Sequence, residues 1–125
     1  MLKLNNLMIG TSDPKAMAGF YEKVFGRPAD LNEGDQWFSW NTSEKMSLSI
    51  GPHSEVTGRA KEPQRMILNM ETPEVREEFA RIKKASGAAV VKEPYEMGGA
   101  WIATFADPDG NYFQLVSPME PDKRA

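Results

Sequence analysis

The chain has 125 residues but no cysteine and only one histidine. Without cysteine it can form neither a disulfide nor a thiolate, which fits a location in the reducing cytoplasm. His53 lies in a polar stretch with no partner at ligand spacing, so we predict a solvated loop residue. No apolar run approaches the length that spans a membrane, and the N-terminus is too polar for a signal peptide.

Excess positive charge is missing too, since 18 Asp and Glu outnumber 15 Lys and Arg and give a net charge of −3. The one local basic run, Arg81 to Lys84, is predicted to be a solvated helix face. We therefore expect neither a nucleic acid nor a membrane as partner. What remains is a globular composition, long enough to bury a core and rich in methionine and tryptophan.

Two helices are marked by their end signals. Asp13 and Pro14 suit the cap and first turn of a helix that runs from Pro14 to Phe25. A second helix repeats the plan, with Thr72 as its cap and Pro73 in its first turn. Apolar residues recur at helical spacing in both, and a glycine follows each, so both are predicted to be amphipathic helices.

Short extended runs surround these helices in the same order twice, β-α-β-β-β. They lie near Leu4 to Gly10, Ala29 to Leu31, Gln36 to Asn41, Met46 to Ile50, Arg65 to Met70, Ala89 to Lys92, Trp101 to Ala106 and Tyr112 to Ser117. The order predicts one α+β domain with a first module of about residues 2–52 and a second of about 64–118. A Gly- and Pro-rich linker of about 52–63 joins them, and residues 119–125 form a tail.

The stretch FADPDGNYFQLVSP, from Phe105 to Pro118, combines a turn with a strand. Pro108 suits the second turn position, and Gly110 supplies the left-handed residue that closes a hairpin. As a calcium loop the stretch fails, because its glycine comes too soon and no glutamate follows at the right distance. Its aspartates are therefore predicted to form a turn.

Strand alternation places Asn6, Arg65 and Gln114 on the strand faces that point away from the helices. If the helices cover one face of a curved sheet, these three side chains line a concavity on the other. Arg65 is then either a strand-end side chain that reaches solvent or a clamp for a carboxylate or phosphate.

The two modules, the motif FYEKVFG (Phe20 to Gly26) and FADPDGNYFQLVSP together resemble the vicinal oxygen chelate superfamily. This superfamily holds glyoxalases, bleomycin-resistance proteins and extradiol dioxygenases. The resemblance spans about Leu2 to Met119 and implies a curved, half-open mixed sheet with helices on its outer face. It also implies a small-molecule ligand in the cup and a homodimer, while the activity stays open because one scaffold serves many chemistries.

The resemblance further implies three metal-ligand positions: a histidine opening the first strand, another opening the fifth, and a glutamate before the leucine of the last. These positions fall on Asn6, on Arg65 (or on Gln64 if the register slips by one) and on Gln114. A neutral amide binds a divalent ion poorly through one oxygen, and a guanidinium cannot be a ligand. We therefore expect no metal here and no other cofactor.

Aromatic residues supply the rest of the predicted site. Phe38, Trp40 and Trp101 are expected to form the wall of a pocket that stacks a flat or apolar ligand. Together with Asn6, Arg65 and Gln114 they make up the predicted ligand-binding set.

The predicted function is a metal-free binding protein of the bleomycin-resistance kind, for a small apolar or aromatic molecule with or without an anionic group. The alternative is a glyoxalase-like lyase or isomerase, or a dioxygenase-related enzyme, acting on a small oxygenated substrate. Such reactions usually need a Lewis acid, so an enzyme without metal would rely on Arg65 for electrostatic stabilisation. A third possibility is a structural or regulatory role in which the fold serves dimerisation.

Overall fold

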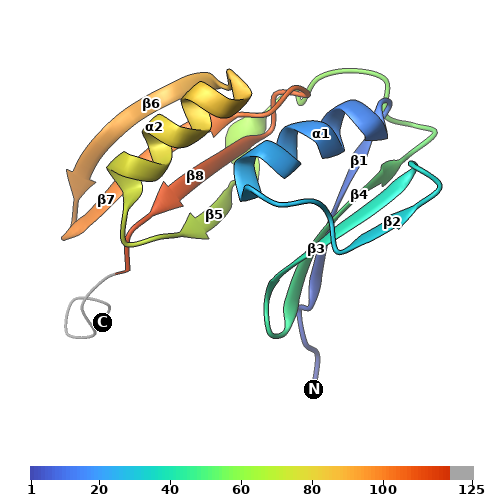
Figure 1. The fold of residues 1–125 in the computed structure, drawn as a ribbon, viewed down its shortest axis with the longest axis horizontal. Coiled ribbons are helices and arrows are strands. Elements are labelled where there is room, and N and C mark those ends of the chain that lie inside the picture. Colours follow the sequence, from blue (N-terminus) through green and yellow to red (C-terminus); the bar gives the residue numbers. More distant parts are fainter. Residues whose placement is uncertain (119–125) are drawn as a thin grey trace. The chain divides into compact units, whose positions relative to one another are not determined.

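The computed structural model describes residues 1–118 and shows two compact units, the first ending at Gly58 and the second beginning at Arg59 (Figure 1). The first unit contains β1 (Asn6–Thr11), α1 (Pro14–Phe25), β2 (Leu31–Glu33), β3 (Trp37–Ser43) and β4 (Met46–Pro52). The second contains a 3₁₀ turn η1 (Pro63–Arg65), β5 (Leu68–Glu71), α2 (Val75–Ser86), β6 (Ala89–Met97), β7 (Ala100–Ala106) and β8 (Tyr112–Val116). No helix in this part of the chain is long and apolar enough to cross a bilayer. The predicted tail of residues 119–125 lies outside the described residues.

Each unit has its own four-stranded mixed sheet. The strand orders are β1-β4-β3-β2 and β5-β8-β7-β6. In both sheets the strand before the helix runs parallel to the last strand, while the remaining pairs are antiparallel. A parallel pair needs a long crossover connection, which the helix and the next two strands supply. The prediction of an α+β fold with two β-α-β-β-β modules is confirmed.

Helix α1 begins and ends where the sequence indicates. Asp13 Oδ1 accepts a hydrogen bond from the Ala16 amide at 3.1 Å, and Pro14 occupies the first turn, where no amide donor is required. Gly26 follows the helix with φ of 74°, a left-handed conformation that glycine adopts without a Cβ clash. Local signals alone therefore fix both ends of α1.

Helix α2 begins at Val75, two residues later than Pro73, so the predicted start of this helix is wrong. The Thr72 hydroxyl accepts a hydrogen bond from the Glu74 amide at 3.1 Å, which holds a short turn ahead of the helix instead of capping it. Gly87 ends α2 as expected, with φ of 65°. Because α2 starts two residues later than predicted, the residue of β5 that corresponds to a given residue of β1 also lies two positions later than predicted.

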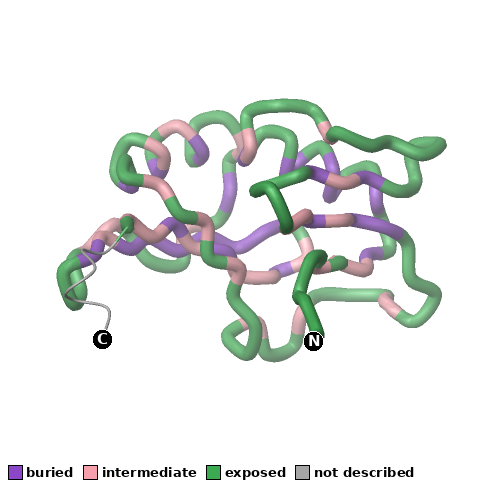
Figure 2. Tube along the Cα trace, turned by 90° about the horizontal axis from the view of Figure 1, so that it is seen from below, coloured by how far each residue is buried: buried purple, intermediate pink, exposed green. Residues whose placement is uncertain are grey.

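Each helix packs on one side of its own sheet, called here the helix side, and leaves the other side, the open side, uncovered (Figure 1). The buried apolar residues lie along the inner strands of each sheet and along each helix, where the trace of Figure 2 is purple. In the first unit they are Met17, Tyr21, Val24, Phe38, Trp40, Leu48 and Ile50; in the second they are Val75, Phe79, Ile82, Ala103, Phe105, Phe113 and Leu115.

A hydrogen-bonded clasp around Asp30 fixes the segment between α1 and β2. Asp30 Oδ2 accepts from Arg27 Nη1 at 2.8 Å and from the Asn41 amide at 2.7 Å, and Arg27 Nη2 donates to the Asn41 carbonyl at 2.7 Å. The hydrogen bond from the Arg27 guanidinium, followed by that from the Asn41 amide, lowers the pKa of Asp30 from its ordinary value of 3.8. Asp30 is therefore ionised at neutral pH, as the clasp requires.

Candidate functional site

Asn6 opens β1 on the open side of the first sheet, as the strand alternation predicts. Its Nδ2 donates to Ser47 Oγ at 2.7 Å and to Ser49 Oγ at 2.9 Å, both on β4. Ser49 Oγ shares a further hydrogen bond of 2.8 Å with Ser39 Oγ on β3. The register pairs Asn6 with Ser47 and Ser39 with Ser49, so these side chains stand together across three strands. We call Asn6, Ser39, Ser47 and Ser49 the Ser/Asn network.

Gln114 lies on β8, on the open side of the second sheet. It is half-buried, and its Oε1 accepts a hydrogen bond from Thr104 Oγ1 on β7 at 3.1 Å. Asn69 on β5 is its register partner across the parallel pair, so two amide side chains are neighbours on this surface. The position therefore presents amide donors where the resemblance implies a carboxylate.

Arg65 is not part of the fifth strand, so the prediction of a strand from Arg65 to Met70 is wrong for its first three residues. Gln64 and Arg65 belong to the 3₁₀ turn η1. The Arg65 guanidinium is paired with Glu62 at 3.0 Å, and its side chain is 70% exposed. This position favours the solvent-reaching interpretation of Arg65 over the anion clamp.

The late start of α2 also changes which residue corresponds to Asn6. The helices begin 61 positions apart (75 − 14), and the glycines that follow them are separated equally (87 − 26). The same step from Asn6 leads to Ile67, a partly exposed residue directly before β5. The sequence points to Arg65 because it takes Thr72 as the cap of the second helix, whereas the N-cap is Glu74, two residues later.

Phe38 and Trp40 lie on the helix side, opposite to the side that a pocket wall requires, so their predicted place needs correction. Trp40 is only 1% exposed, its ring lies 5.5 Å from that of Phe25, and its Nε1 donates to the Arg27 carbonyl at 3.1 Å. Because these contacts fill the space beneath α1, both aromatic residues belong to the core of the first unit.

Trp101 also faces the helix of its unit. It shares a face of β7 with Ala103 and Phe105, which are buried beneath α2. The Arg76 guanidinium of α2 lies 4.8 Å from the centre of the indole, a cation–π contact. The structure therefore places Trp101 apart from the open side that carries Gln114.

Trp37 is the tryptophan that the structure places on the open side of the first sheet. It is 40% exposed, and its six-membered ring lies over Gly51, where an added Cβ would approach Cε3 and Cζ3 within 2.2 Å. The alternation of β3 already set Trp37 opposite to Phe38 and Trp40, so its position was visible in the sequence. What the sequence did not show was which side of β3 the helix covers.

The three implied metal-ligand positions do not fit a divalent ion. At Asn6 the amide nitrogen faces the serine hydroxyls, and at Gln114 the amide oxygen already accepts from Thr104. In the second unit the corresponding residue is Ile67, which offers no ligand atom, while Gln64 and Arg65 lie in η1 outside the strand. Within residues 1–118, no group of three or more His, Cys, Asp and Glu is placed to hold a metal.

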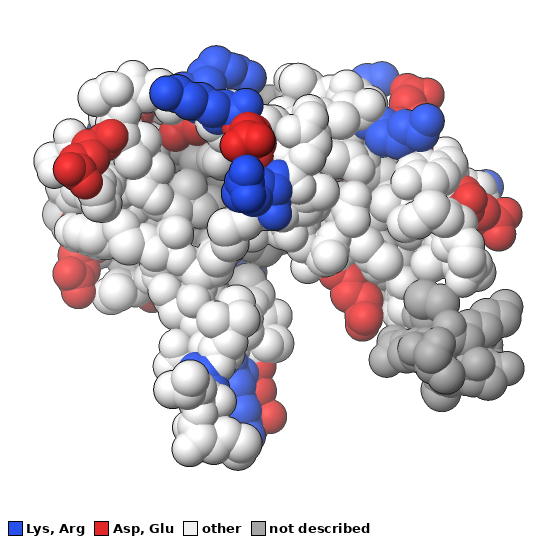
Figure 3. Space-filling model, turned by 180° about the vertical axis from the view of Figure 1, so that it is seen from behind, with Lys and Arg blue, Asp and Glu red and all other residues white. Residues whose placement is uncertain are grey.

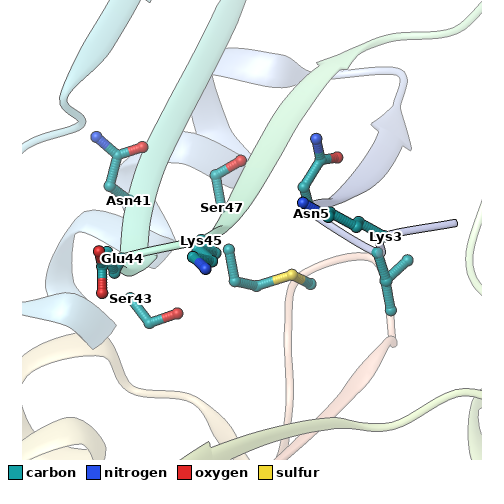
Figure 4. A pocket seen from close by; sticks show the side chains of 9 residues that line it. Lys3, Asn5, Asn41, Ser43, Glu44, Lys45 and Ser47 are labelled. Atoms are coloured by element: carbon teal, nitrogen blue, oxygen red, sulfur yellow. The ribbon is translucent and has the colours of Figure 1, made fainter. Parts of the chain in front are cut away.

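A hollow of about 490 Å³ adjoins the Ser/Asn network at one end of the first sheet (Figure 4). It lies between the N-terminal segment and the β3–β4 hairpin. Asn41 and Ser47 line it from the sheet, and Lys3, Glu44 and Lys45 bring charged groups to it. Ser47 belongs to both, so the uncharged network continues into a charged region.

Sequence comparison identifies the family of this fold. Residues 6–116 match the glyoxalase-like domain family. The chain belongs to this family. The match runs from β1 to β8, and the superfamily inferred from the sequence, the vicinal oxygen chelate superfamily, is confirmed. No curated protein matches the chain significantly.

Solved structures share the fold of this glyoxalase-like domain along its length. A glyoxalase/bleomycin resistance protein from Albidiferax ferrireducens T118 has a TM-score of 0.73 at 20% identity, covering 92% of this chain and 98% of that one. A glyoxalase/bleomycin resistance protein/dioxygenase family enzyme from Burkholderia phytofirmans PsJN has a TM-score of 0.71 at 24% identity, covering 93% and 98%. A lactoylglutathione lyase from Agrobacterium tumefaciens has a TM-score of 0.68 at 16% identity, covering 92% of each chain. At such identities the likeness concerns the fold alone.

Proposed function

We propose that this glyoxalase-like domain binds a small aromatic or apolar molecule on the open side of its sheets without the help of a metal. The observation that carries the proposal is the Ser/Asn network, which occupies the implied metal-ligand position at Asn6. There the Asn6 side chain donates to Ser47 and Ser49 at 2.7 and 2.9 Å, so its amide hydrogens are used within the sheet. A few convergent polar groups beside exposed apolar side chains are the usual make-up of a small-molecule site.

A metal-independent lyase or isomerase is the weaker candidate. It depended on Arg65 to stabilise developing charge, and that guanidinium lies in η1, exposed and paired with Glu62. An electrostatic catalyst must be held at the reacting atoms and shielded from water. Binding without turnover therefore has more support than catalysis.

A ligand titration followed by tryptophan fluorescence tests the proposed function, because Trp37 reports directly from the open side. We expect saturable changes with members of a panel of aromatic compounds. Replacing Asn6 by alanine should weaken binding about fivefold, since loss of one buried or ligand-facing hydrogen bond costs about 1 kcal/mol. Lys15→Ala, which removes an exposed side chain of α1 on the helix side, is the control and should leave affinity unchanged.

Two results would contradict the proposal. One is a panel without any binder. The other is a single divalent ion bound at unit stoichiometry, measured by mass spectrometry, that disappears in both Asn6→Ala and Gln114→Ala.

We also propose that the domain forms a homodimer, as the family resemblance implies. Within their own sheets β1, β2, β5 and β6 are the end strands, and an end strand has unpaired backbone groups that can pair with another chain. Light scattering should give twice the chain mass of 14.0 kDa at micromolar concentration. A mass of one chain across the accessible concentration range would show that the domain is a monomer.

A further inference from the structure

The open side of the first sheet carries a surface that is uncharged but rich in hydrogen-bonding groups. We call it the platform: the Ser/Asn network together with Trp37 and Met8. Met8 pairs with Ser49 in the β1–β4 register, and Trp37 comes two residues before Ser39 on β3, so all six side chains share one face. Both Met8 and Trp37 are exposed large hydrophobic residues. The platform therefore combines a polar centre with two apolar flanks.

The position of the Trp37 indole depends on Gly51. Any Cβ at position 51 would collide with the indole, so residue 51 must lack a side chain for the ring to lie where it does. The ring is supported by backbone on one side while much of the residue stays exposed. A supported, solvent-facing indole is suited to stack against a flat ligand.

The Ser/Asn network has hydroxyl hydrogens and an amide oxygen that are available to a ligand. The Ser47 carbonyl, 3.4 Å from Asn6 Nδ2, can only accept, so the amide nitrogen faces the sheet and Oδ1 points away as an acceptor. One of the two hydroxyl hydrogens of Ser39 and Ser49 forms the hydrogen bond between them, and the other remains available to a ligand. The hydroxyl hydrogen of Ser47 donates to no group of residues 1–118. A ligand above the network thus meets two hydroxyl donors and one amide acceptor.

The lack of charge among the platform residues favours neutral ligands over anionic ones. None of the six platform residues is ionisable, and the side chain opposite Trp37 across the β2–β3 pair is the acidic Glu33. Figure 3, which views the molecule from behind the helices of Figure 1, shows a largely uncharged surface with charged side chains in small groups. Lys3, Lys45 and Glu44 line the hollow beside Ser47, whereas Trp37 comes four residues before Asn41 of that hollow along β3. An anion stacked at Trp37 would therefore lose its hydration without a cationic partner among the platform residues, whereas a neutral amide or ketone would lose little.

From this arrangement we infer that the platform binds an uncharged aromatic compound that carries a carbonyl oxygen beside an N–H or O–H group. The ring stacks on Trp37, the carbonyl accepts from the serine hydroxyls, and the N–H or O–H donates to Asn6 Oδ1. This inference rests on the proposed function and specifies its ligand class. It replaces the anionic ligand that Arg65 suggested in the sequence.

Binding of 2-naphthamide and 2-naphthoate to the full chain, measured by calorimetry at neutral pH, tests the inference. The two compounds share ring and size, and only the naphthoate is anionic. We expect the amide to bind at least about tenfold more tightly than the naphthoate, and acetamide, which lacks the ring, to show no binding. Trp37→Ala should weaken binding of the amide about tenfold, since both the ring stacking and the apolar area that it buries are lost.

Gly51→Ala tests the position of the Trp37 ring while the tryptophan itself is kept. The new methyl group must push the exposed indole off its seat, so naphthamide affinity should fall as in Trp37→Ala while thermal unfolding changes little. Met97→Ala removes an exposed apolar side chain from the end of β6 and should leave affinity unchanged.

The inference is overturned if naphthoate binds as tightly as naphthamide, or if naphthamide binds and Trp37→Ala has no effect. It is also overturned if naphthamide does not bind while other panel compounds bind in a manner that depends on Asn6, a result that keeps the proposed function. If no compound of either set binds, both fail.

Discussion

Replacing Phe105 by alanine should lower the free energy of unfolding by about 4 kcal/mol, the largest effect that we expect from a single core position. Phe105 is fully buried at 0% exposure near the end of β7. Its ring stacks on Phe79 of α2 at 4.9 Å between centroids and on Phe113 of β8 at 5.4 Å. The truncation would therefore leave a cavity bounded by two rings that cannot close over it.

Urea denaturation of the full chain, followed by circular dichroism, measures this loss. Phe105→Leu keeps most of the volume and should cost only about 1.5 kcal/mol. Trp37→Ala removes an even larger but partly exposed side chain and should cost less than about 1 kcal/mol. If Phe105→Ala cost no more than Trp37→Ala, the stacked arrangement beneath α2 would be incorrect.

Elements whose ends depend on local chemistry were predictable from the sequence. Asp13 and Pro14 fix the start of α1 because a cap and a fixed φ act within one turn of chain. Gly110 takes the left-handed conformation predicted for the DPDG turn, with φ of 83°. In both cases the interacting groups are near neighbours along the chain, so no tertiary contact could override them.

The predictions that failed needed information from outside the segment concerned. Alternation along β3 correctly grouped Phe38 with Trp40, but it could not say that α1 covers their side. The Arg27 carbonyl that accepts from the Trp40 indole belongs to another part of the chain. Arg65 was misplaced because the turn η1 forms where an extended run was expected, and because its partner Glu62 lies before that run.

The same distinction applies to the candidate site. Asn6 and Gln114 stand where the resemblance implies a histidine and a glutamate, and this difference is visible from single residues, since a side-chain amide binds metal ions poorly. The platform could not, because it consists of side chains from β1, β3 and β4 whose contacts exist only in the paired sheet. A tertiary arrangement of ordinary serines leaves no motif in the sequence.

Asp107→Ala should destabilise the chain by about 3 kcal/mol, because it removes the acceptor around which the turn between β7 and β8 is built. Asp107 is 3% exposed. Its Oδ1 accepts from the amides of Asp109 and Asn111, both at 2.9 Å, and its Oδ2 accepts from Asn111 Nδ2 at 2.9 Å. An alanine leaves these donors without their acceptor, which costs more than never having made the bonds.

Asp107→Asn is the informative intermediate. Its remaining oxygen can still accept from the two backbone amides, while its new NH₂ group faces the Asn111 amide, which must turn over to accept. We expect about half the loss of the alanine variant, and a negligible loss for Glu44→Ala, which removes an exposed carboxylate from the β3–β4 turn. Equal losses in Asp107→Asn and Asp107→Ala would show that charge rather than hydrogen bonding holds the turn.

The consequences of Asp107→Ala should reach the candidate site of the second unit. The turn sets the register in which Ala106 pairs with Tyr112, and two pairs further along the same ladder Thr104 meets Gln114. The linker is tied to the turn as well, since the Ala60 amide donates to the Asp109 carbonyl at 2.8 Å and Arg59 Nη1 donates to the Pro108 carbonyl at 3.1 Å. Amide hydrogen exchange should therefore speed up at Ala60 and along β8, but not along β4 of the first unit. If exchange became faster only at Asp109 and Asn111, the pairing of β7 with β8 would not depend on the turn.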